Sequence, residues 1–210
     1  VTRVAESSNP AFASGAPIEG GPDWISGGAD SDVIVGAFGS DELHGDGASA
    51  PFGDDVIFGD FAKVQWINGA FSSFESVYAG EGDSDLIFSD GGHDTAIGGA
   101  AADWIFGADG DDVLVGDHGR VDYLAAGIRR VESIFPGIGG DDYILGEADD
   151  DVIIGGDGAD TASGGDGEDI LHGDHAWIEH ASTVFTGTGT MFPGVGGADS
   201  MTGDAGDDVL

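Results

Sequence analysis

Two consecutive blocks of nine residues decide the fold: Gly98-Gly99-Ala100-Ala101-Ala102-Asp103-Trp104-Ile105-Phe106 and Gly107-Ala108-Asp109-Gly110-Asp111-Asp112-Val113-Leu114-Val115. Each block opens with small residues, has aspartate at the sixth place and has an aliphatic residue at the eighth. Glycine at the start allows the positive φ angles of a tight turn. The last three residues have the aliphatic or β-branched character of a short strand. The block therefore predicts one turn followed by one strand of three residues.

The block occurs fourteen times, and two of its places never vary in character. Copies begin at residues 18, 27, 36, 45, 80, 89, 98, 107, 137, 146, 155, 164, 194 and 203, and the copy at 45 carries five extra residues. The sixth place is always aspartate: Asp23, Asp32, Asp41, Asp55, Asp85, Asp94, Asp103, Asp112, Asp142, Asp151, Asp160, Asp169, Asp199 and Asp208. The eighth place is always apolar: Ile25, Ile34, Leu43, Ile57, Ile87, Ala96, Ile105, Leu114, Ile144, Ile153, Ala162, Leu171, Met201 and Leu210. Such repetition predicts a solenoid, in which each unit packs only on its neighbours.

A longer period of 57 residues is superimposed on the blocks. Three inserts open alike, with Gly59-Asp60, Gly116-Asp117 and Gly173-Asp174, so that each period holds four blocks and a 21-residue insert. The expected division, within one continuous solenoid, is 1–17 tail of an insert, 18–58 roll block 1, 59–79 insert, 80–115 roll block 2, 116–136 insert, 137–172 roll block 3, 173–193 insert and 194–210 start of roll block 4.

The inserts have the pattern of β-hairpins. In the first, Ala62 to Ile67 alternates in polarity, Asn68-Gly69 supplies a two-residue turn, and Phe71 to Tyr78 returns. The second insert has the same pattern around Ala125-Ala126-Gly127, whereas Trp177 to Phe192 in the third fits it less well. All five basic residues of the chain lie in insert sequence. Two uses are open: the hairpins cover the edge of the roll, or they mediate lateral association.

Two blocks would make one coil, with strands on opposite faces and the eighth-place side chains pointing between them. The expected fold is therefore all-β, a parallel β-roll (β-solenoid) with inserted β-hairpins. Strands of three residues and a core this thin do not offset the entropy of ordering so many turns. The fold therefore needs a second source of stability.

Charge points to that source. The chain has 41 glycines, 41 acidic residues and 5 basic ones, which gives a formal net charge of -36. So much negative charge opposes compaction unless a cation neutralises it. It also argues against nucleic acid as a partner, because phosphate binding needs clustered basic residues. There is no cysteine, and no apolar run is long enough to predict a membrane span. The final residues fall within a block, so we expect the chain to be part of a longer repetitive polypeptide.

With fourteen blocks of the form Gly-Gly-x-Gly-x-Asp-x-U-x, where U is aliphatic, the chain resembles the RTX (repeats-in-toxin) family of secreted bacterial proteins, also known for hemolysin-type repeats. The resemblance implies calcium bound in the turns between coils, with the sixth-place aspartates listed above as side-chain metal ligands and backbone carbonyls completing each site. It also implies export in an unfolded state and folding in millimolar calcium outside the cell. At six to eight oxygens per ion, we expect roughly ten Ca²⁺ ions.

Some blocks depart from the pattern. Aspartate replaces glycine at the fourth place in Asp30, Asp83 and Asp149, and alanine replaces it in Ala101. Asp83 and Asp149 either add a ligand oxygen or are tolerated where the turn relaxes. Sites beside an insert are expected to lack a stacked neighbour.

Catalytic motifs are missing from the sequence. Paired acids such as Asp111-Asp112 recur with the repeat, which argues against a catalytic pair, and we expect no enzymatic activity. His172, His175 and His180 lie close together in sequence and suggest either a transition-metal site or solvated loop histidines. Trp24 and Trp104, at the seventh place, point outward. They suit either a platform for sugars or packing beneath an insert, and we expect the packing.

We therefore expect a calcium-binding structural repeat module of a secreted adhesin, surface-layer or extracellular filament or matrix protein, which folds on binding Ca²⁺. Its expected partners are calcium and, through the inserts, further copies in fibres or other surface proteins. Two alternatives are a C-terminal secretion and folding domain of an RTX enzyme or toxin, and a carbohydrate-binding module that uses the aromatic residues of the inserts. The 57-residue period favours the first function.

Overall fold

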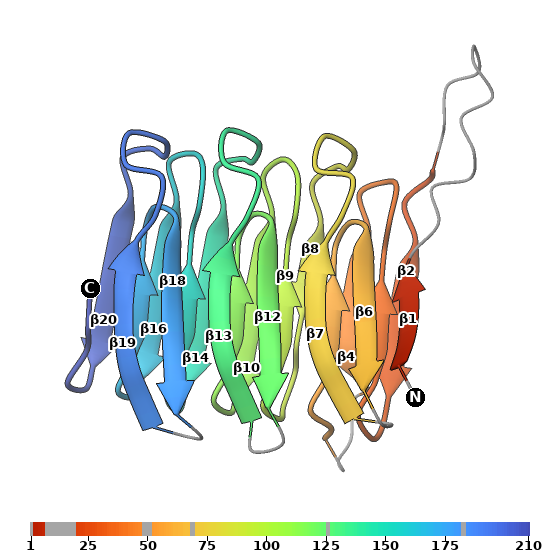
Figure 1. The fold of residues 1–210 in the computed structure, drawn as a ribbon, viewed down its shortest axis with the longest axis horizontal. Coiled ribbons are helices and arrows are strands. Elements are labelled where there is room, and N and C mark those ends of the chain that lie inside the picture. The colour runs from red at the N-terminus through yellow and green to blue at the C-terminus, as the bar shows by residue number, and fades with distance from the viewer. Residues whose placement is uncertain (1, 7–19, 48–51, 68–69, 125–126, 182–183) are drawn as a thin grey trace.

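The computed structural model describes residues 2–6, 20–47, 52–67, 70–124, 127–181 and 184–210. Within them it contains twenty strands and no helix. The strands form three sheets stacked in layers along a short rod, across which every strand runs (Figure 1). The chain is a parallel β-roll with a third, antiparallel layer added to it.

The two roll sheets take alternate blocks. The sheet that we call the outer roll sheet contains, in spatial order, β2 (Trp24–Gly28), β4 (Glu42–Asp46), β8 (Leu86–Phe88), β10 (Trp104–Asp109), β14 (Tyr143–Ala148), β16 (Thr161–Asp166) and β20 (Ser200–Ala205). The inner roll sheet contains β3 (Val33–Val35), β5 (Val56–Phe58), β9 (Thr95–Ile97), β11 (Val113–Val115), β15 (Val152–Ile154) and β17 (Ile170–His172). All neighbours within both sheets are parallel, as in a roll with two strands to each coil.

The inserts form the third layer, which we call the hairpin sheet. It consists of β1 (Thr2–Glu6), β6 (Ala62–Ile67), β7 (Ala70–Ser76), β12 (Gly119–Leu124), β13 (Gly127–Ser133), β18 (Ala176–Ala181) and β19 (Val184–Thr190). Each hairpin pairs with the next one, β7 with β12 and β13 with β18, and all pairs are antiparallel. The hairpins therefore form one continuous sheet rather than three separate excursions; their strands lie at the front in Figure 1.

One core lies between the two roll sheets. It is built from eighth-place residues, as the sequence predicts, because parallel pairing places equivalent residues of successive coils side by side. Leu43, Ile87, Ile105 and Leu114 are fully buried there. Leu210 is an exception, since it is 65% exposed.

A second core lies between the inner roll sheet and the hairpin sheet. Seventh- and ninth-place residues of the inner strands, such as Val113 and Val115, pack there against Val64, Phe74 and Val131 of the hairpins. All of them are buried. The inner roll sheet is therefore buried on both faces, which explains its continuous apolar strands.

Two expectations about the inserts need correction. They cover a whole face of the roll, not merely its edge, because alternate residues of each hairpin are apolar and face the inner roll sheet. The third insert, expected to fit less well, forms the same hairpin as the others, β18 paired with β19. The predicted turn residues 68–69 and 125–126, part of the five-residue insertion (48–51) and most of the N-terminal segment (7–19) lie outside the described residues.

The outward face of the hairpin sheet carries paired charges. Lys63 lies opposite Glu75, with 2.5 Å between Nζ and Oε1. Arg120 lies opposite Glu75 on one neighbouring strand and opposite Glu132 on the other. It also forms an ion pair with Asp122. Arg130 bonds Glu132 and Glu179 and lies 5.0 Å from the ring centre of Trp177. Exposed ion pairs are each worth about 1 kcal/mol or less, so their main effect is to align neighbouring hairpins.

Replacing Phe74 by alanine tests the second core. Phe74 is fully buried between Val64 and Val121 on the inward face of the hairpin sheet. We expect Phe74→Ala to lower the free energy of unfolding at saturating calcium by about 3–5 kcal/mol, through the lost transfer energy and the cavity. Denaturant unfolding followed by circular dichroism measures this. Gln65→Ala, on the outward face of the same hairpin, is the control and should change stability by no more than about 0.5 kcal/mol. Equal effects of the two substitutions would contradict the layered packing.

Candidate metal centre

The sixth-place aspartates form two ladders, one along each edge of the roll. In each ladder, the backbone N–H of an aspartate donates to the carboxylate Oδ1 of the aspartate in the next coil, over 2.7–3.1 Å. One ladder contains Asp23, Asp41, Asp85, Asp103, Asp142, Asp160 and Asp199, and the other contains Asp32, Asp55, Asp94, Asp112, Asp151, Asp169 and Asp208. The aspartates thus fix the register between successive turns.

The second carboxylate oxygen has no partner in most of these residues. Oδ2 is buried and without a hydrogen bond in Asp41, Asp55, Asp85, Asp94, Asp103, Asp112, Asp142, Asp151, Asp160 and Asp169. Buried polar atoms are almost always paired in native proteins, because leaving one unpaired costs its hydration energy. Ten unpaired carboxylate oxygens in two rows therefore require a proton or a cation.

Backbone carbonyl oxygens meet these carboxylates at glycines that open six of the blocks and two of the inserts. Asp112 Oδ2 and the carbonyl oxygen of Gly146 converge on Gly107: a Cβ atom added to Gly107 would lie 2.5 Å from the first and 2.7 Å from the second. The same pairing of Oδ2 with a glycine carbonyl of the adjacent coil recurs at Gly27, Gly36, Gly59, Gly98, Gly116, Gly146 and Gly155. Carboxylate and carbonyl oxygens are the ligands that Ca²⁺ prefers. The residues present therefore fit a calcium ion, and only glycine leaves room for it.

Burial raises the pKa of the ten ladder aspartates whose Oδ2 is buried and unpaired. It rises to about 6 in Asp55, about 7 in Asp112 and about 9 in Asp151. Loss of hydration is the largest cause, and neighbouring carboxylates raise the pKa further. The N–H of the preceding coil lowers it in part. Without a metal, the folded roll therefore holds its most buried ladder carboxylates, such as that of Asp151, protonated near neutral pH.

A model of the RTX calcium-binding nonapeptide repeat matches the chain in four copies, at residues 19–48, 88–120, 136–174 and 193–210, which together exceed half of its length. The chain belongs to the RTX calcium-binding nonapeptide repeat family. No curated protein and no solved structure matches it. RTX nonapeptide repeats bind Ca²⁺, and the carboxylate and carbonyl oxygens along the ladders are of the kind that this cation prefers. The assignment of individual aspartates as ligands stays a prediction.

Side chains alone do not complete a site in this RTX roll. Among the described residues, no group of three or more His, Cys, Asp or Glu side chains is placed to hold a metal. Each candidate site therefore depends on backbone carbonyls for most of its oxygens.

In the blocks that lack glycine at the fourth place, the side chains of Asp83 and Asp149 are exposed. The backbone of Asp30, Ala101 and Asp149 has φ angles of 74°, 68° and 74°, in the left-handed region that glycine favours.

Sequence reasoning missed the role of the aspartate that follows the first glycine at each insertion. Asp117 Oδ1 accepts the N–H of Gly140, where the chain returns from the second insert, and its Oδ2 accepts the N–H of Asp157 in the next coil. Asp174 accepts the N–H of Gly197 in the same way, over 3.1 Å. Each carboxylate therefore holds together a turn that the insert divides.

The other two insertions have an aspartate at the same place. Asp46 receives the N–H of Gly53 across the five-residue insertion. Asp60 accepts the N–H of Ala100 over 2.5 Å, and burial raises its pKa to about 8. The shared Gly-Asp opening of the inserts was the signal in the sequence, but the partners of the carboxylates lie too far along the chain to be recognised.

The histidines near the third insert do not come together. His172 bonds Thr188, and His180 packs edge-on against Phe185. His175 is fully buried, with Nε2 3.3 Å from Asp157 Oδ2, and its ring meets that of Phe192 edge-on.

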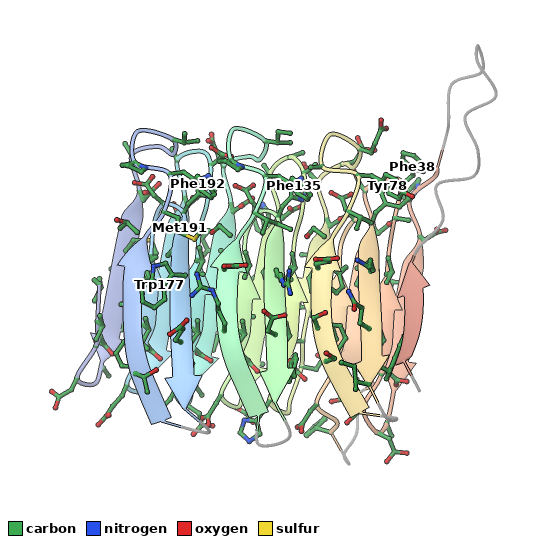
Figure 2. The ribbon with its side chains drawn as sticks, in the orientation of Figure 1. Phe38, Tyr78, Phe135, Trp177, Met191 and Phe192 are labelled. Atoms are coloured by element: carbon green, nitrogen blue, oxygen red, sulfur yellow. The ribbon has the colours of Figure 1, made fainter. Side chains whose placement is uncertain are left out.

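One aromatic residue of this kind occurs in each 57-residue period. Figure 2 shows Phe192 on the same edge of the molecule as Tyr78 and Phe135. These rings cover the ends of the hairpins.

Asp112→Ala should weaken one calcium site and fray the adjoining coils, with a loss of roughly 1–3 kcal/mol of stability at saturating calcium, because a buried charged ligand is removed. Asp112→Asn keeps an acceptor for the N–H of Asp94 and so isolates the charge: calcium affinity should fall, whereas stability without calcium should not. Calorimetric calcium titration and denaturant unfolding measure both. Asp111→Ala, which removes the same charge from an exposed neighbour, is the control. Unchanged affinity in the Asp112 variants would count against the ligand assignment.

Stability without metal should fall as pH rises. An unfolded aspartate has a pKa near 3.9, whereas folded values here reach about 6 to about 9. Between about pH 4 and about pH 9 the folded state therefore binds more protons than the unfolded state, and the free energy of unfolding decreases with pH. Far-UV circular dichroism of chelator-treated protein should show most β-structure near the acidic limit. With saturating calcium the trend should reverse, since protons compete with the metal. A metal-free protein that gains structure as pH rises would refute this.

Proposed function

We propose that this chain is a non-catalytic, calcium-dependent structural module of a secreted adhesin, surface-layer or extracellular filament protein. It folds where calcium is plentiful, outside the cell, because calcium binding is coupled to closure of the turns. The proposed ligands are the fourteen sixth-place aspartates, which together hold roughly ten Ca²⁺ ions. The proposed units are the four roll blocks and their inserts, in one continuous solenoid.

The observation that carries this proposal is the set of ten buried, unpaired carboxylate oxygens. A protein that works inside a cell at low calcium would have to keep these groups protonated or unfold. Extracellular calcium modules typically bind Ca²⁺ with dissociation constants of about 10⁻⁴–10⁻³ M. Such an affinity suits a protein that stays unfolded at the low calcium concentration inside the cell and folds at the higher concentration outside it. No helix among the described residues could cross a membrane.

The continuous hairpin sheet favours a structural module over a secretion domain of an enzyme or toxin. Each period adds two hairpin strands and two coils, and pairing between hairpins extends through every described period. The layered rod can therefore be lengthened without changing its cross-section. A full-length sequence with many further 57-residue periods would support this, and an upstream catalytic motif would support the secretion domain instead.

Calcium titration of chelator-treated protein tests the folding switch. We expect a cooperative gain of β-structure in far-UV circular dichroism at roughly millimolar calcium, and no such gain with magnesium, which rarely occupies all-protein cages. Light scattering recorded in parallel measures association through the hairpins: a rise with folding would support self-assembly, and a flat signal would indicate a monomeric rod. A protein already folded in chelator at neutral pH, and unaffected by calcium, would refute the proposed function.

A further inference from the structure

The outer roll sheet is the face of the roll that the hairpin sheet does not cover. Its seventh-place side chains form a row across successive coils: Trp24, Glu42, Leu86, Trp104 and Tyr143. Trp24 is 66% exposed and Trp104 56% exposed. The expectation that these two tryptophans pack beneath an insert is therefore wrong. They are three strand steps apart, roughly 14 Å at the usual spacing of neighbouring strands.

A shallow groove of about 690 Å³ runs along this row. The two indoles lie among its lining residues, together with Glu42 and the hydroxyl-bearing Ser40 and Ser84. Ser40, Glu42 and Ser84 are exposed. The groove thus combines two large flat apolar surfaces with a few polar groups, which is typical of a small-molecule site.

Neighbouring side chains hold the indoles in place. Trp24 Nε1 donates to Glu42 Oε1 over 3.2 Å, and the Trp24 ring lies 5.6 Å from that of His44. His44 Nε2 lies 3.1 Å from the same Oε1. Trp104 packs against Tyr143, with 5.3 Å between ring centres. A ligand would therefore meet rings that are already oriented, which lowers the entropy cost of binding.

The stack of rings continues beside the groove. His44 is stacked on Phe88 at 4.8 Å, and Phe88 on Phe106 at 5.1 Å. Because Trp24 and His44 both contact Oε1 of Glu42, its Oε2 is left to accept a hydrogen bond from a ligand. The groove thus offers apolar ring faces and a hydrogen-bond acceptor within one row of side chains.

Charge narrows the class of ligand. Glu42 lines the groove and is not one of the proposed calcium ligands, and the described basic side chains Lys63, Arg120 and Arg130 lie on the hairpin sheet, on the opposite side of the roll. Anionic ligands are therefore repelled. A second copy placed face to face would oppose carboxylates of the same sign.

An extended peptide is also disfavoured. The row of side chains crosses the strands, and β4, β8 and β10 have hydrogen-bonded neighbours on both sides. Along these three strands a peptide would therefore find no free backbone edge to pair with. The ligand must instead be recognised by ring faces and hydroxyl-bonding groups.

We propose that the groove between Trp24 and Trp104 binds a neutral carbohydrate chain. The polarised C–H groups on the flat faces of pyranose rings stack on the electron-rich faces of the two indoles. Glu42 Oε2 accepts hydrogen bonds from the sugar hydroxyls, and the hydroxyls of Ser40 and Ser84 either donate to them or accept from them. The insert tryptophans are not used, because Trp66 packs against the second core and Trp177 against Arg130. Because the groove needs stacked coils, this site rests on the calcium-folded module proposed above.

Binding to a panel of immobilised neutral, amino and acidic glycans tests this, followed by calorimetry with the best-bound oligosaccharide at saturating calcium. We expect binding to neutral glycans and none to sulfated or uronic-acid glycans. Trp24→Ala and Trp104→Ala should each raise the dissociation constant at least tenfold. Trp177→Ala, a tryptophan on the opposite side of the roll, should leave it unchanged.

Circular dichroism of the same samples separates the two proposals. A protein that shows no response to calcium counts against the calcium-dependent module. A folded protein that binds no neutral glycan would overturn the proposal that the groove binds carbohydrate. Glycan binding that survives the combined Trp24→Ala and Trp104→Ala substitutions would overturn it as well. Sedimentation gives the remaining outcome: dimers that dissociate in the double variant, without glycan binding, would make a second copy of the chain the occupant and would also overturn the proposal.

Discussion

The whole structure depends on carboxylates stacked directly above one another in two ladders. Ten of the fourteen sixth-place aspartates, Asp94 and Asp112 among them, use Oδ1 to accept the amide N–H of the preceding coil and leave Oδ2 buried and unpaired. Register and charge are thus coupled in the same side chain. Two like charges about 5 Å apart repel by roughly 3 kcal/mol at an effective dielectric constant near 20, and this cost recurs in every coil. A divalent cation between turns changes repulsion into attraction without altering the hydrogen-bond register.

The hairpin sheet gives a physical reason for the 57-residue period. Four blocks make two coils, which add two strands to each roll sheet, and one insert adds two strands to the hairpin sheet. Neighbouring strands are about 4.8 Å apart in parallel and antiparallel sheets alike, so the three layers advance by the same distance in each period. One hairpin for every four blocks is therefore the ratio that keeps the second core continuous. More hairpins would not fit along the rod, and fewer would expose inner-sheet residues such as Val113 and Val115.

The sequence predicted what is encoded locally. Fixed spacing placed the strands, the aspartates and the eighth-place core, because a turn and a strand of nine residues determine which side chains share a face. It did not predict the partners of each hairpin. Alternation in Ala62–Ile67 shows that one face is apolar, but nothing in it specifies that β7 pairs with β12 of the following insert. Likewise, the Gly116-Asp117 pair can be recognised in the sequence. The hydrogen-bond partners of Asp117, Gly140 and Asp157, cannot, because they lie in other turns.

The site of insertion determines which face of the roll stays free. Every long insert follows an inner strand, and only three residues separate Phe58 of β5 from Ala62 of β6. Such a short connection folds the hairpin back over the inner roll sheet, and a carboxylate such as Asp117 closes the divided turn so that the ladder continues past it. Hairpins entering at the opposite edge, after an outer strand, would instead cover Trp24 and Trp104. Placing all three inserts at one edge therefore gives the rod two different sides: one covered by paired charges, and one on which flat aromatic rings stay exposed to solvent.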